Sequence, residues 1–182
     1  VYAGNFVRVQ GLNMLVSAFD LLIREQADGG RQLVLVGEGV LKNPIIQQIN
    51  NLKIRERVEI LGPMPKNELL SYLGKSEILF IGLDGHPALE MTVPSKVFDY
   101  LAVGRPIVAA LGGEGRDIIG RCSENYLANS SDIVSIKNGF ELLIQRASPA
   151  THIDCNVDLV REKFTREYST GVLEEVFSKA VS

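Results

Sequence analysis

Short runs of apolar residues recur along the chain, and each is only three to five residues long. Runs of this length, almost free of polar residues, are typical of parallel β-strands that are buried on both faces. The pattern predicts strands at Val1–Ala3, Gln32–Val36, Val58–Leu61, Ile78–Ile81, Ile107–Ala110 and Tyr126–Ala128.

The longer stretches between these runs carry apolar residues at helical spacing. In the first of them, Leu12, Leu15, Val16 and Phe19 recur at intervals of three and four residues, and Asp28-Gly29-Gly30 follows as a stop signal. Further helices are predicted at Leu41–Leu52, Lys66–Gly74, Pro94–Val103, Glu114–Arg121, Ile133–Arg146 with Asp132 as its N-cap, and, within the C-terminal residues 157–181, at Val157–Phe164 and Tyr168–Val181. Strands that alternate with helices form right-handed βαβ units. We therefore expect an α/β fold, a Rossmann-like doubly wound parallel sheet of about six strands with helices on both faces.

The composition is that of an ordinary globular protein. The chain has 182 residues, of which 46% are hydrophobic and 23% are charged, and its formal net charge is -3. This length fits one domain, residues 1–182, that buries its own core. The acidic balance, without a basic stripe, argues against a nucleic-acid partner. No stretch approaches 18 consecutive apolar residues, so no transmembrane helix is expected.

The chain opens directly in an apolar run, Val1-Tyr2-Ala3-Gly4, without an initiator methionine or a signal peptide. We therefore expect a piece of a longer protein. The two cysteines, Cys122 and Cys155, belong to no Cys-x-x-Cys pair, and His86 and His152 share no metal-ligand spacing with them. We expect two free thiols in a reducing, cytoplasmic compartment, and no bound metal.

Ligands of open α/β sheets bind beyond the carboxyl ends of the strands, so candidate chemistry is sought there. After the first strand, Gly4 lets the backbone approach a phosphate and Arg8 offers guanidinium donors, although a plain strand–helix turn with a surface arginine explains the same residues. After the second strand, Gly37-Glu38-Gly39 lacks the third glycine of a dinucleotide fingerprint and favours a tight turn. After the third strand, the extended turn Leu61-Gly62-Pro63-Met64 exposes backbone groups suited to a base edge.

The fourth predicted strand is followed by the richest set of polar groups. Pro94 fits the first turn of a helix whose free N–H groups, together with Ser95 and Lys96, favour an anion. Glu90, on the loop before that helix, is a carboxylate suited to sugar hydroxyls, and Asp99, one turn inside it, is suited to ribose hydroxyls. A solvated loop acid and an ordinary surface charge are the plain alternatives for these two carboxylates.

The segment Asp99-Tyr100-Leu101-Ala102-Val103-Gly104-Arg105-Pro106-Ile107-Val108 resembles the donor-binding signature of GT-B-fold retaining glycosyltransferases of family 4, in which an acidic residue precedes A-x-G-x-P-V/I. Tyr2-Ala3-Gly4-Asn5, followed by Gln10-Gly11, resembles the phosphate loop of that family. Leu61-Gly62-Pro63-Met64 resembles its base-binding turn. The Thr-Val-Pro-Ser-Lys sequence before the helix resembles a bacterial branch that transfers amino sugars for surface polysaccharide.

The resemblance implies the donor-binding, C-terminal half of a two-domain enzyme whose N-terminal acceptor half is absent. It implies nucleotide and diphosphate contacts for Gly4, Asn5, Arg8, Gln10, Leu61, Gly62, Met64, Pro94, Ser95, Lys96 and Asp99, and donor-sugar contacts for Glu90, Met91, Thr92 and Val93. Glu90, Arg8 and Lys96 are the implied catalytic residues. The sequence departs from the family where Gln10 replaces a common lysine, where Asp99 replaces a common glutamate, and where eight residues rather than seven separate the two acids.

The implied reaction transfers a sugar from a nucleoside-diphosphate sugar, with UDP as the expected nucleotide, to an acceptor with retention. The expected process is the synthesis of cell-surface polysaccharide or lipopolysaccharide, with a saccharide or lipid-linked acceptor and no cofactor. The missing half is the expected point of contact with the inner face of the cytoplasmic membrane, and the chain alone is expected to bind the donor without turning it over. Two alternatives use the same fold, a UDP-sugar epimerase domain and a non-catalytic nucleotide-binding module.

Overall fold

The structure is a computed structural model that describes residues 1–84, 89, 91–146, 148 and 151–165. Its strands are all parallel to their hydrogen-bonded neighbours and form two three-stranded sheets, in the orders β1-β2-β3 and β4-β5-β6. The strands are β1 (Tyr2–Ala3), β2 (Leu33–Val36), β3 (Val58–Leu61), β4 (Leu79–Gly82), β5 (Ile107–Ala110) and β6 (Tyr126–Leu127). All six predicted strands are confirmed to within two residues at each end.

The two sheets adjoin where β1 meets β4. The Phe80 N–H donates to the Val1 carbonyl oxygen at 2.9 Å, and the Val1 nitrogen donates to the Ile78 carbonyl oxygen at 2.7 Å. The Ala3 N–H donates to the Tyr100 hydroxyl at 2.8 Å and not to β4, so these bonds do not continue along β1, and the expected single sheet of six strands is corrected to two adjoining sheets. The strand order reverses at β1 and β4, and such a switch point is where open α/β sheets bind ligands.

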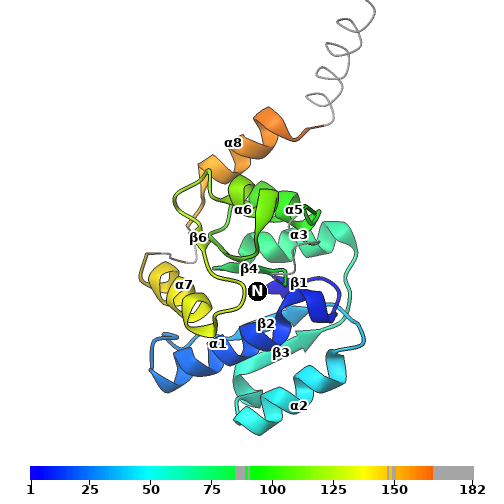
Figure 1. The fold of residues 1–182 in the computed structure, drawn as a ribbon, viewed down its shortest axis with the longest axis vertical. Helices are drawn as coiled ribbons and strands as arrows, with labels where there is room; N and C mark the ends of the chain where they lie inside the picture. Colours follow the sequence, from blue (N-terminus) through cyan, green and yellow to red (C-terminus); the bar gives the residue numbers. More distant parts are fainter. Residues whose placement is uncertain (85–88, 90, 147, 149–150, 166–182) are drawn as a thin grey trace, which may run out of the picture.

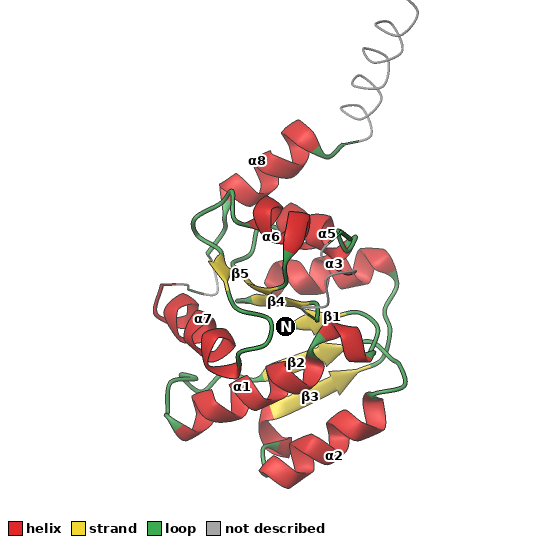
Figure 2. Cartoon of the chain, viewed as in Figure 1, coloured by secondary structure: helices red, strands yellow, loops and turns green. Residues whose placement is uncertain are grey.

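The helices cover both faces of the strands, as Figure 1 and Figure 2 show. One hydrophobic cluster contains side chains of α1, α2 and α7, and the other contains side chains of α3, α5, α6 and α8. The helices are α1 (Leu12–Arg24), α2 (Lys42–Leu52), α3 (Lys66–Lys75), α5 (Lys96–Ala102), α6 (Gly113–Ile119), α7 (Ile133–Arg146) and α8 (Asp154–Lys163), with 3-10 turns η1 (Arg8–Gln10) and η2 (Arg55–Arg57). None of the helices in the described part of the chain has both the length and the apolar character that a membrane span requires.

The apolar runs belong to strands because both of their faces are covered. Along β2, Leu33 and Leu35 contact the cluster of α1, α2 and α7, whereas Val34 and Val36 contact the opposite cluster. Successive side chains of a strand point to opposite faces, so a strand between two helix layers needs apolar residues at every position. The predicted doubly wound arrangement is confirmed on this point.

Two helix starts differ from the prediction by more than one residue. Helix α5 begins at Lys96 with Ser95 as its N-cap, two residues later than the Pro94 start expected from the sequence. A separate turn precedes it, because the Thr92 N–H already donates to the Leu89 carbonyl oxygen at 3.0 Å. Helix α8 begins at Asp154, three residues before the expected start. The predicted helix at 168–181 lies outside the described residues.

The predicted N-cap of α7 is confirmed. The Asp132 Oδ1 atom accepts hydrogen bonds from the Val134 N–H at 2.8 Å and the Ser135 N–H at 3.2 Å. These are two of the N–H groups that a helix start leaves without a helical partner.

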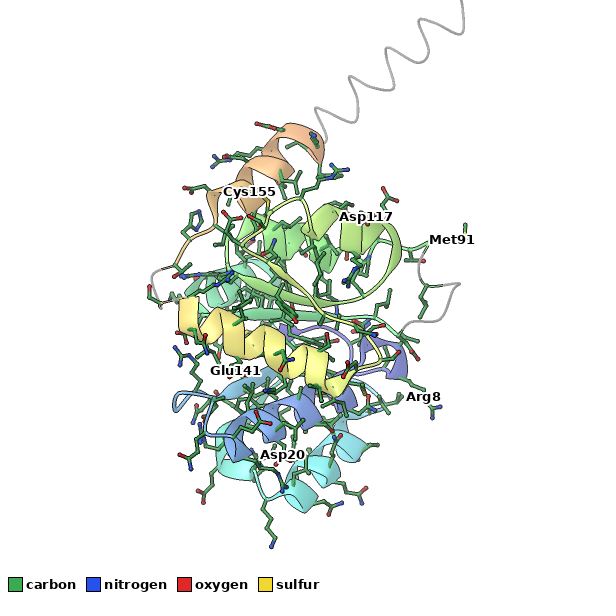
Figure 3. All side chains as sticks on the ribbon, turned by 60° about the vertical axis from the view of Figure 1, so that its left-hand side comes forward. Arg8, Asp20, Met91, Asp117, Glu141 and Cys155 are labelled. Atoms are coloured by element: carbon green, nitrogen blue, oxygen red, sulfur yellow. A yellow bond between two sulfur atoms is a disulfide. The ribbon has the colours of Figure 1, made fainter. Side chains whose placement is uncertain are left out.

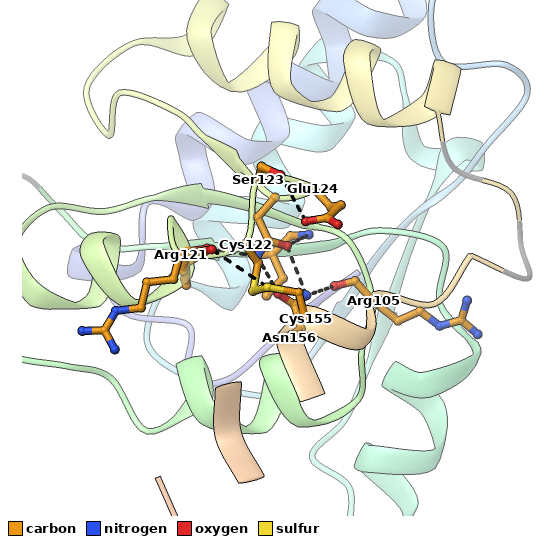
Figure 4. The surroundings of a disulfide bond; sticks show 10 residues. Arg105, Arg121, Cys122, Ser123, Glu124, Cys155 and Asn156 are labelled. Carbon is orange, nitrogen blue, oxygen red and sulfur yellow. Dashed lines mark hydrogen bonds between the residues drawn. A yellow bond between two sulfur atoms is a disulfide. The ribbon is translucent and has the colours of Figure 1, made fainter. Parts of the chain in front are cut away.

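The two cysteines form a disulfide, so the expectation of two free thiols is wrong. Cys122 follows α6 and Cys155 lies in the first turn of α8, and their Cα atoms are 5.8 Å apart. Figure 4 shows the surroundings, in which the fully buried Asn156 donates to the Arg105 carbonyl oxygen at 3.1 Å and accepts from the Asn125 amide at 2.7 Å. The spacing of the two cysteines in the sequence did not indicate that the fold brings them together. Because they are not free thiols, they no longer support a reducing compartment.

Candidate functional site

The loop after β1 lies at the switch point and is shaped by the loop after β2. The Gly4 N–H donates to the Val36 carbonyl oxygen at 2.9 Å, and the Phe6 N–H donates to the Glu38 carbonyl oxygen at 2.8 Å. A Cβ atom at Gly39, where φ is +154°, would lie 2.5 Å from the Phe6 carbonyl oxygen, and one at Gly37 would overlap the Gly4 carbonyl. The tight turn expected at Gly37-Glu38-Gly39 is not found there: the turn begins at Gly39, whose carbonyl oxygen accepts from the Lys42 N–H at 3.0 Å. The two glycines instead allow two backbones to approach closely.

The ammonium of Lys96 lies against this loop. Its Nζ atom donates to the Gln10 Oε1 atom, lies 3.3 Å from the Tyr2 hydroxyl oxygen, and sits 4.5 Å from the centroid of the Tyr2 ring. A Cβ atom at Gly4, where φ is +146°, would be only 2.7 Å from Nζ, so a side chain at this position would displace the ammonium. Lys96, Gln10 and Gly4, three residues expected at the diphosphate, are therefore brought together.

This ammonium has no carboxylate partner among the described residues, and burial lowers its pKa to about 8. A cation over an aromatic face is stabilised by the ring, but the gain is smaller than that from a paired carboxylate. Lys96 is thus a partly buried positive charge whose local partners are all neutral, a chemistry that suits an anionic ligand.

Tyr2 belongs to the segment that resembles the phosphate loop, but the sequence predicted no contact for its own side chain, because it lies in a short apolar strand. Tyr2 is fully buried, its hydroxyl donates to the Asn5 carbonyl oxygen at 2.9 Å, and burial raises the pKa of that hydroxyl. The Lys96 ammonium lies over the face of its ring. A polar tip on an otherwise apolar strand was the one available signal.

The base turn and the predicted ribose acid are brought side by side. Lys66 begins α3 directly after the turn Leu61–Pro65, and its Nζ atom lies 3.1 Å from the Asp99 Oδ1 atom. Asp99 lies three residues beyond Lys96, so both side chains share one face of α5. Gly62 is exposed and Met64 is partly buried against the α3 and α5 cluster, as an accessible backbone turn with an apolar neighbour requires.

Arg8 points elsewhere. It lies on η1, is exposed, and lines a cavity of about 520 Å³ together with Asp84. Figure 3 shows its side chain projecting outward on the same side of the molecule as Met91, which is 89% exposed. Arg8 is thus only two residues from Gln10 in the chain, but its side chain lines this cavity, whereas the Lys96 ammonium contacts Gln10 and Tyr2.

The remaining predicted site residues are dispersed around this edge. Asn5 and Thr92 are exposed, and Val93, Pro94 and Ser95 border the start of α5. The Thr92 N–H is used in its own turn, so it does not join a set of free donors there. Glu90 and His86 lie outside the described residues. Within residues 1–84 and the other described ranges, no group of three histidine, cysteine or acidic side chains is arranged to hold a metal ion.

Comparisons with solved structures agree on the fold. The chain is similar to a sucrose-phosphate synthase from Thermosynechococcus elongatus (TM-score 0.78, 18% identity, 100% of this chain and 45% of that one). It is also similar to Anabaena HepE in complex with UDP (0.75, 16%, 97% and 48%) and to S. aureus TarM, whose complex contains UDP (0.73, 15%, 97% and 34%). At such identities the likeness shows the Rossmann-like GT-B domain fold alone, and the chain spans less than half the length of each of these proteins.

The comparison with protein families identifies a family, which a likeness in fold alone does not. No curated protein sequence matches the chain. Residues 1–146 match the family described as glycosyl transferases group 1, and that match covers both halves of the site, from the loop after β1 to the face of α5. The chain therefore belongs to the group 1 glycosyl transferases.

Proposed function

We propose that the chain is the donor-binding part of a glycosyltransferase that transfers the sugar of a UDP-sugar to an acceptor with retention of configuration and releases UDP. The observation that carries this proposal is the Lys96 ammonium, held at the switch point without a carboxylate partner among the described residues. An uncompensated charge of this kind is costly unless a ligand completes it. The anion proposed is a diphosphate, because the neighbouring turn Leu61–Met64 is proposed to bind the base of the same nucleotide and Asp99 its ribose.

Lys96 also accounts for the departure at Gln10. The family often has a lysine at that position, and here the Lys96 side chain from α5 reaches the Gln10 Oε1 atom. The positive charge expected on the phosphate loop is thus supplied by a different element at the same place. Arg8, on the same η1 turn, is the second cation proposed for the diphosphate, and its exposed side chain would have to turn out of the cavity that it lines with Asp84 to reach that position.

The proposed chemistry uses electrostatic stabilisation. The bond between the anomeric carbon and the diphosphate oxygen breaks, and negative charge collects on the departing UDP. Lys96 would stabilise that charge, and one such donor is worth about 2.7–4 kcal/mol in comparable sites. The acceptor hydroxyl oxygen then forms a bond to the anomeric carbon from the same face, and its proton passes to the diphosphate. Glu90 is proposed to contact the donor sugar.

The choice of UDP is supported by the neighbours. HepE is described in complex with UDP, and a pneumococcal O-GlcNAc transferase, GtfA, in complex with UDP and GlcNAc. A role in cell-surface polysaccharide or lipopolysaccharide synthesis is supported by the likeness to the lipopolysaccharide outer core galactosyltransferase WaaB. We propose that neither a metal ion nor another cofactor takes part, and that turnover and any contact with a membrane need a second domain.

Calorimetric titration of the chain with UDP in the presence of a chelator tests the proposal. We expect UDP to bind with a measurable dissociation constant. Uridine, which lacks the phosphates, should bind much more weakly, because the Lys96 ammonium is proposed to bind the diphosphate. Equal affinity for UDP and uridine would contradict the assigned role of Lys96. An absence of heat with UDP, GDP and ADP alike would contradict the donor-binding function.

A further inference from the structure

The hydroxyl of Tyr100 takes the place of a neighbouring strand at the end of β1. Its oxygen accepts a hydrogen bond from the Ala3 N–H at 2.8 Å, and the hydroxyl donates to the Ala3 carbonyl oxygen at 3.4 Å. Tyr100 is buried, and burial raises the pKa of its hydroxyl, so the hydroxyl keeps the proton that it donates. One side chain of α5 therefore satisfies both backbone groups of a strand residue.

Tyr100 thereby connects α5 to the loop after β1. Ala3 directly precedes Gly4 of that loop, and Tyr100 lies one turn after Lys96 on the helix. Residues four positions apart share one face of a helix, so Lys96 and Tyr100 both reach toward β1. The helix meets the strand at two points, with the Tyr100 hydroxyl at Ala3 and the Lys96 ammonium at Tyr2.

The other contacts of α5 fix its position along β1 less strictly. Val97 and Leu101 are buried in the cluster that α5 shares with α3, α6 and α8, and apolar contacts have no preferred direction. Asp99 pairs with the exposed Lys66, and exposed ion pairs contribute little to stability. The hydrogen bond from Ala3 to Tyr100 is short, directional and buried, so it fixes the distance between the helix and the strand.

We propose that Tyr100 is a positioning residue of the donor site, and that its bonds to Ala3 hold α5 where the Lys96 ammonium reaches the loop after β1. The inference rests on the proposed binding of UDP, in which Lys96 contacts the diphosphate. The contacts of this ammonium are with the neutral side chains of Tyr2 and Gln10, so its place depends on where the helix presents it. Tyr100 acts only through Lys96 and contacts no part of the nucleotide.

Calorimetry with UDP on Tyr100→Phe tests the proposal, because phenylalanine keeps the ring and removes the hydroxyl. We expect UDP affinity to fall about tenfold, since the ammonium no longer lies at the diphosphate. In a Lys96→Met background no ammonium is left to position, so the same change should cost at most about twofold, the margin within which independent changes add. Tyr72→Phe on α3 is the matched control. Tyr72 packs against the same cluster, and its hydroxyl has no hydrogen-bond partner among the described residues.

The position of Lys96 can also be read without UDP. Its Nζ atom lies over the Tyr2 ring, so the ring current moves the signals of the adjoining ε-methylene protons to lower chemical shift. In a chain with ¹³C-labelled lysine, the signal of Lys96 is identified by its loss in Lys96→Met. We expect it to move toward the shift of an exposed lysine in Tyr100→Phe and to stay in place in Tyr72→Phe. A merely structural role of Tyr100 would lower the melting temperature and leave this signal unmoved.

Hydrogen exchange in the unaltered chain gives a second measurement, should Tyr100→Phe fail to fold. Coupling between two sites is reciprocal, so a bond that favours UDP is favoured by UDP to the same degree. Saturating UDP should slow the exchange of the Ala3 N–H about tenfold. It should leave the Ser76 N–H unchanged, which donates to the Leu73 carbonyl oxygen at the far end of α3. Equal changes in the two rates, or none in either, would overturn the proposal.

The remaining outcomes separate this proposal from the donor function. A loss of UDP affinity that depends on Lys96, together with a displaced Lys96 signal, supports it. An equal loss in both backgrounds, an unchanged affinity, or a Lys96 signal that stays in place in Tyr100→Phe overturns it and leaves the donor function standing. If UDP does not bind the unaltered chain, the donor function fails, and the Lys96 signal alone then decides whether Tyr100 positions the ammonium.

Discussion

Replacement of Lys96 by methionine tests the donor site most directly. Methionine has a similar length, so it keeps the contact with the Tyr2 ring and fits beside Gly4, but it removes the ammonium. A hydrogen bond to a charged group contributes about 1.5–3 kcal/mol. Isothermal titration calorimetry at pH 7 should therefore show UDP binding weakened roughly tenfold to a hundredfold.

The pH dependence gives the same experiment a second readout. Burial lowers the pKa of Lys96 to about 8, and only the protonated form attracts a diphosphate. UDP affinity should change little between pH 7 and about 8, fall about tenfold over the next pH unit, and then level off at the affinity of the Lys96→Met variant. The Lys96→Met variant has no group to titrate there, so its affinity should be flat over the same range.

The same substitution should raise the free energy of unfolding. The pKa of Lys96 is lower in the folded protein than the usual 10.5, so the unfolded chain holds the proton more tightly. Stability therefore rises with pH between about 8 and 10.5, and below pH 8 the buried charge costs stability. Removing it should stabilise the chain at pH 7 by about 1–2 kcal/mol, measured by urea unfolding.

The control is Lys75→Met, an equivalent change at the far end of α3, which should alter neither UDP affinity nor its pH profile. The argument fails if Lys96→Met binds UDP as tightly as the original chain. It also fails if the variant still loses affinity above pH 8, because the titrating group would then be another residue.

Two further predictions concern stability. Replacing Cys122 and Cys155 together by serine opens a loop of 33 residues and should lower the free energy of unfolding by about 3–4 kcal/mol, as measured by denaturant unfolding without reductant; equal midpoints for the two proteins would refute this. Gly39→Ala forces a side chain into a positive-φ position against the backbone of the loop after β1, and should cost more than about 2 kcal/mol in thermal unfolding. Its control, Gly74→Ala, meets no atom within 4 Å and should leave stability unchanged or higher by up to about 1 kcal/mol; similar losses in both variants would contradict the steric explanation.

Much of the fold could be predicted because its signals are local. The run Leu33–Val36 is apolar at every position since both of its faces are covered, and the spacing of Leu12, Leu15 and Val16 follows one face of α1. The start of α5 could not be placed from Pro94, because the residues before it close a turn of their own. Two adjoining sheets replace one because the hydroxyl of Tyr100, 97 positions away, takes the Ala3 N–H, and a contact over that distance leaves no local sign in the sequence.

Several residues of the candidate site could be predicted from the sequence, but the contacts between them could not. Gly4, Gln10 and Lys96 were expected near a diphosphate, yet the contact that joins them runs between residues 86 positions apart. The ring of Tyr2 beneath the ammonium has no signature in the spacing of the sequence. Arg8 looked equivalent to Lys96 from the sequence, since the turn that directs it into a separate cavity is a feature of the folded chain.

The two glycines after β2 have a consequence for which residues of the loop after β1 can be replaced. The loop after β1 is held from behind by main-chain groups, through bonds from the Gly4 N–H to Val36 and from the Leu41 N–H to Phe6. Its path therefore depends on glycine at 37 and 39, and hardly at all on the exposed side chains that it carries. Substitutions at Asn5 and Arg8 can alter charge and reach without altering the path of the backbone. The path of this loop and the side chains that it presents are thus encoded by different residues, and one can change while the other is kept.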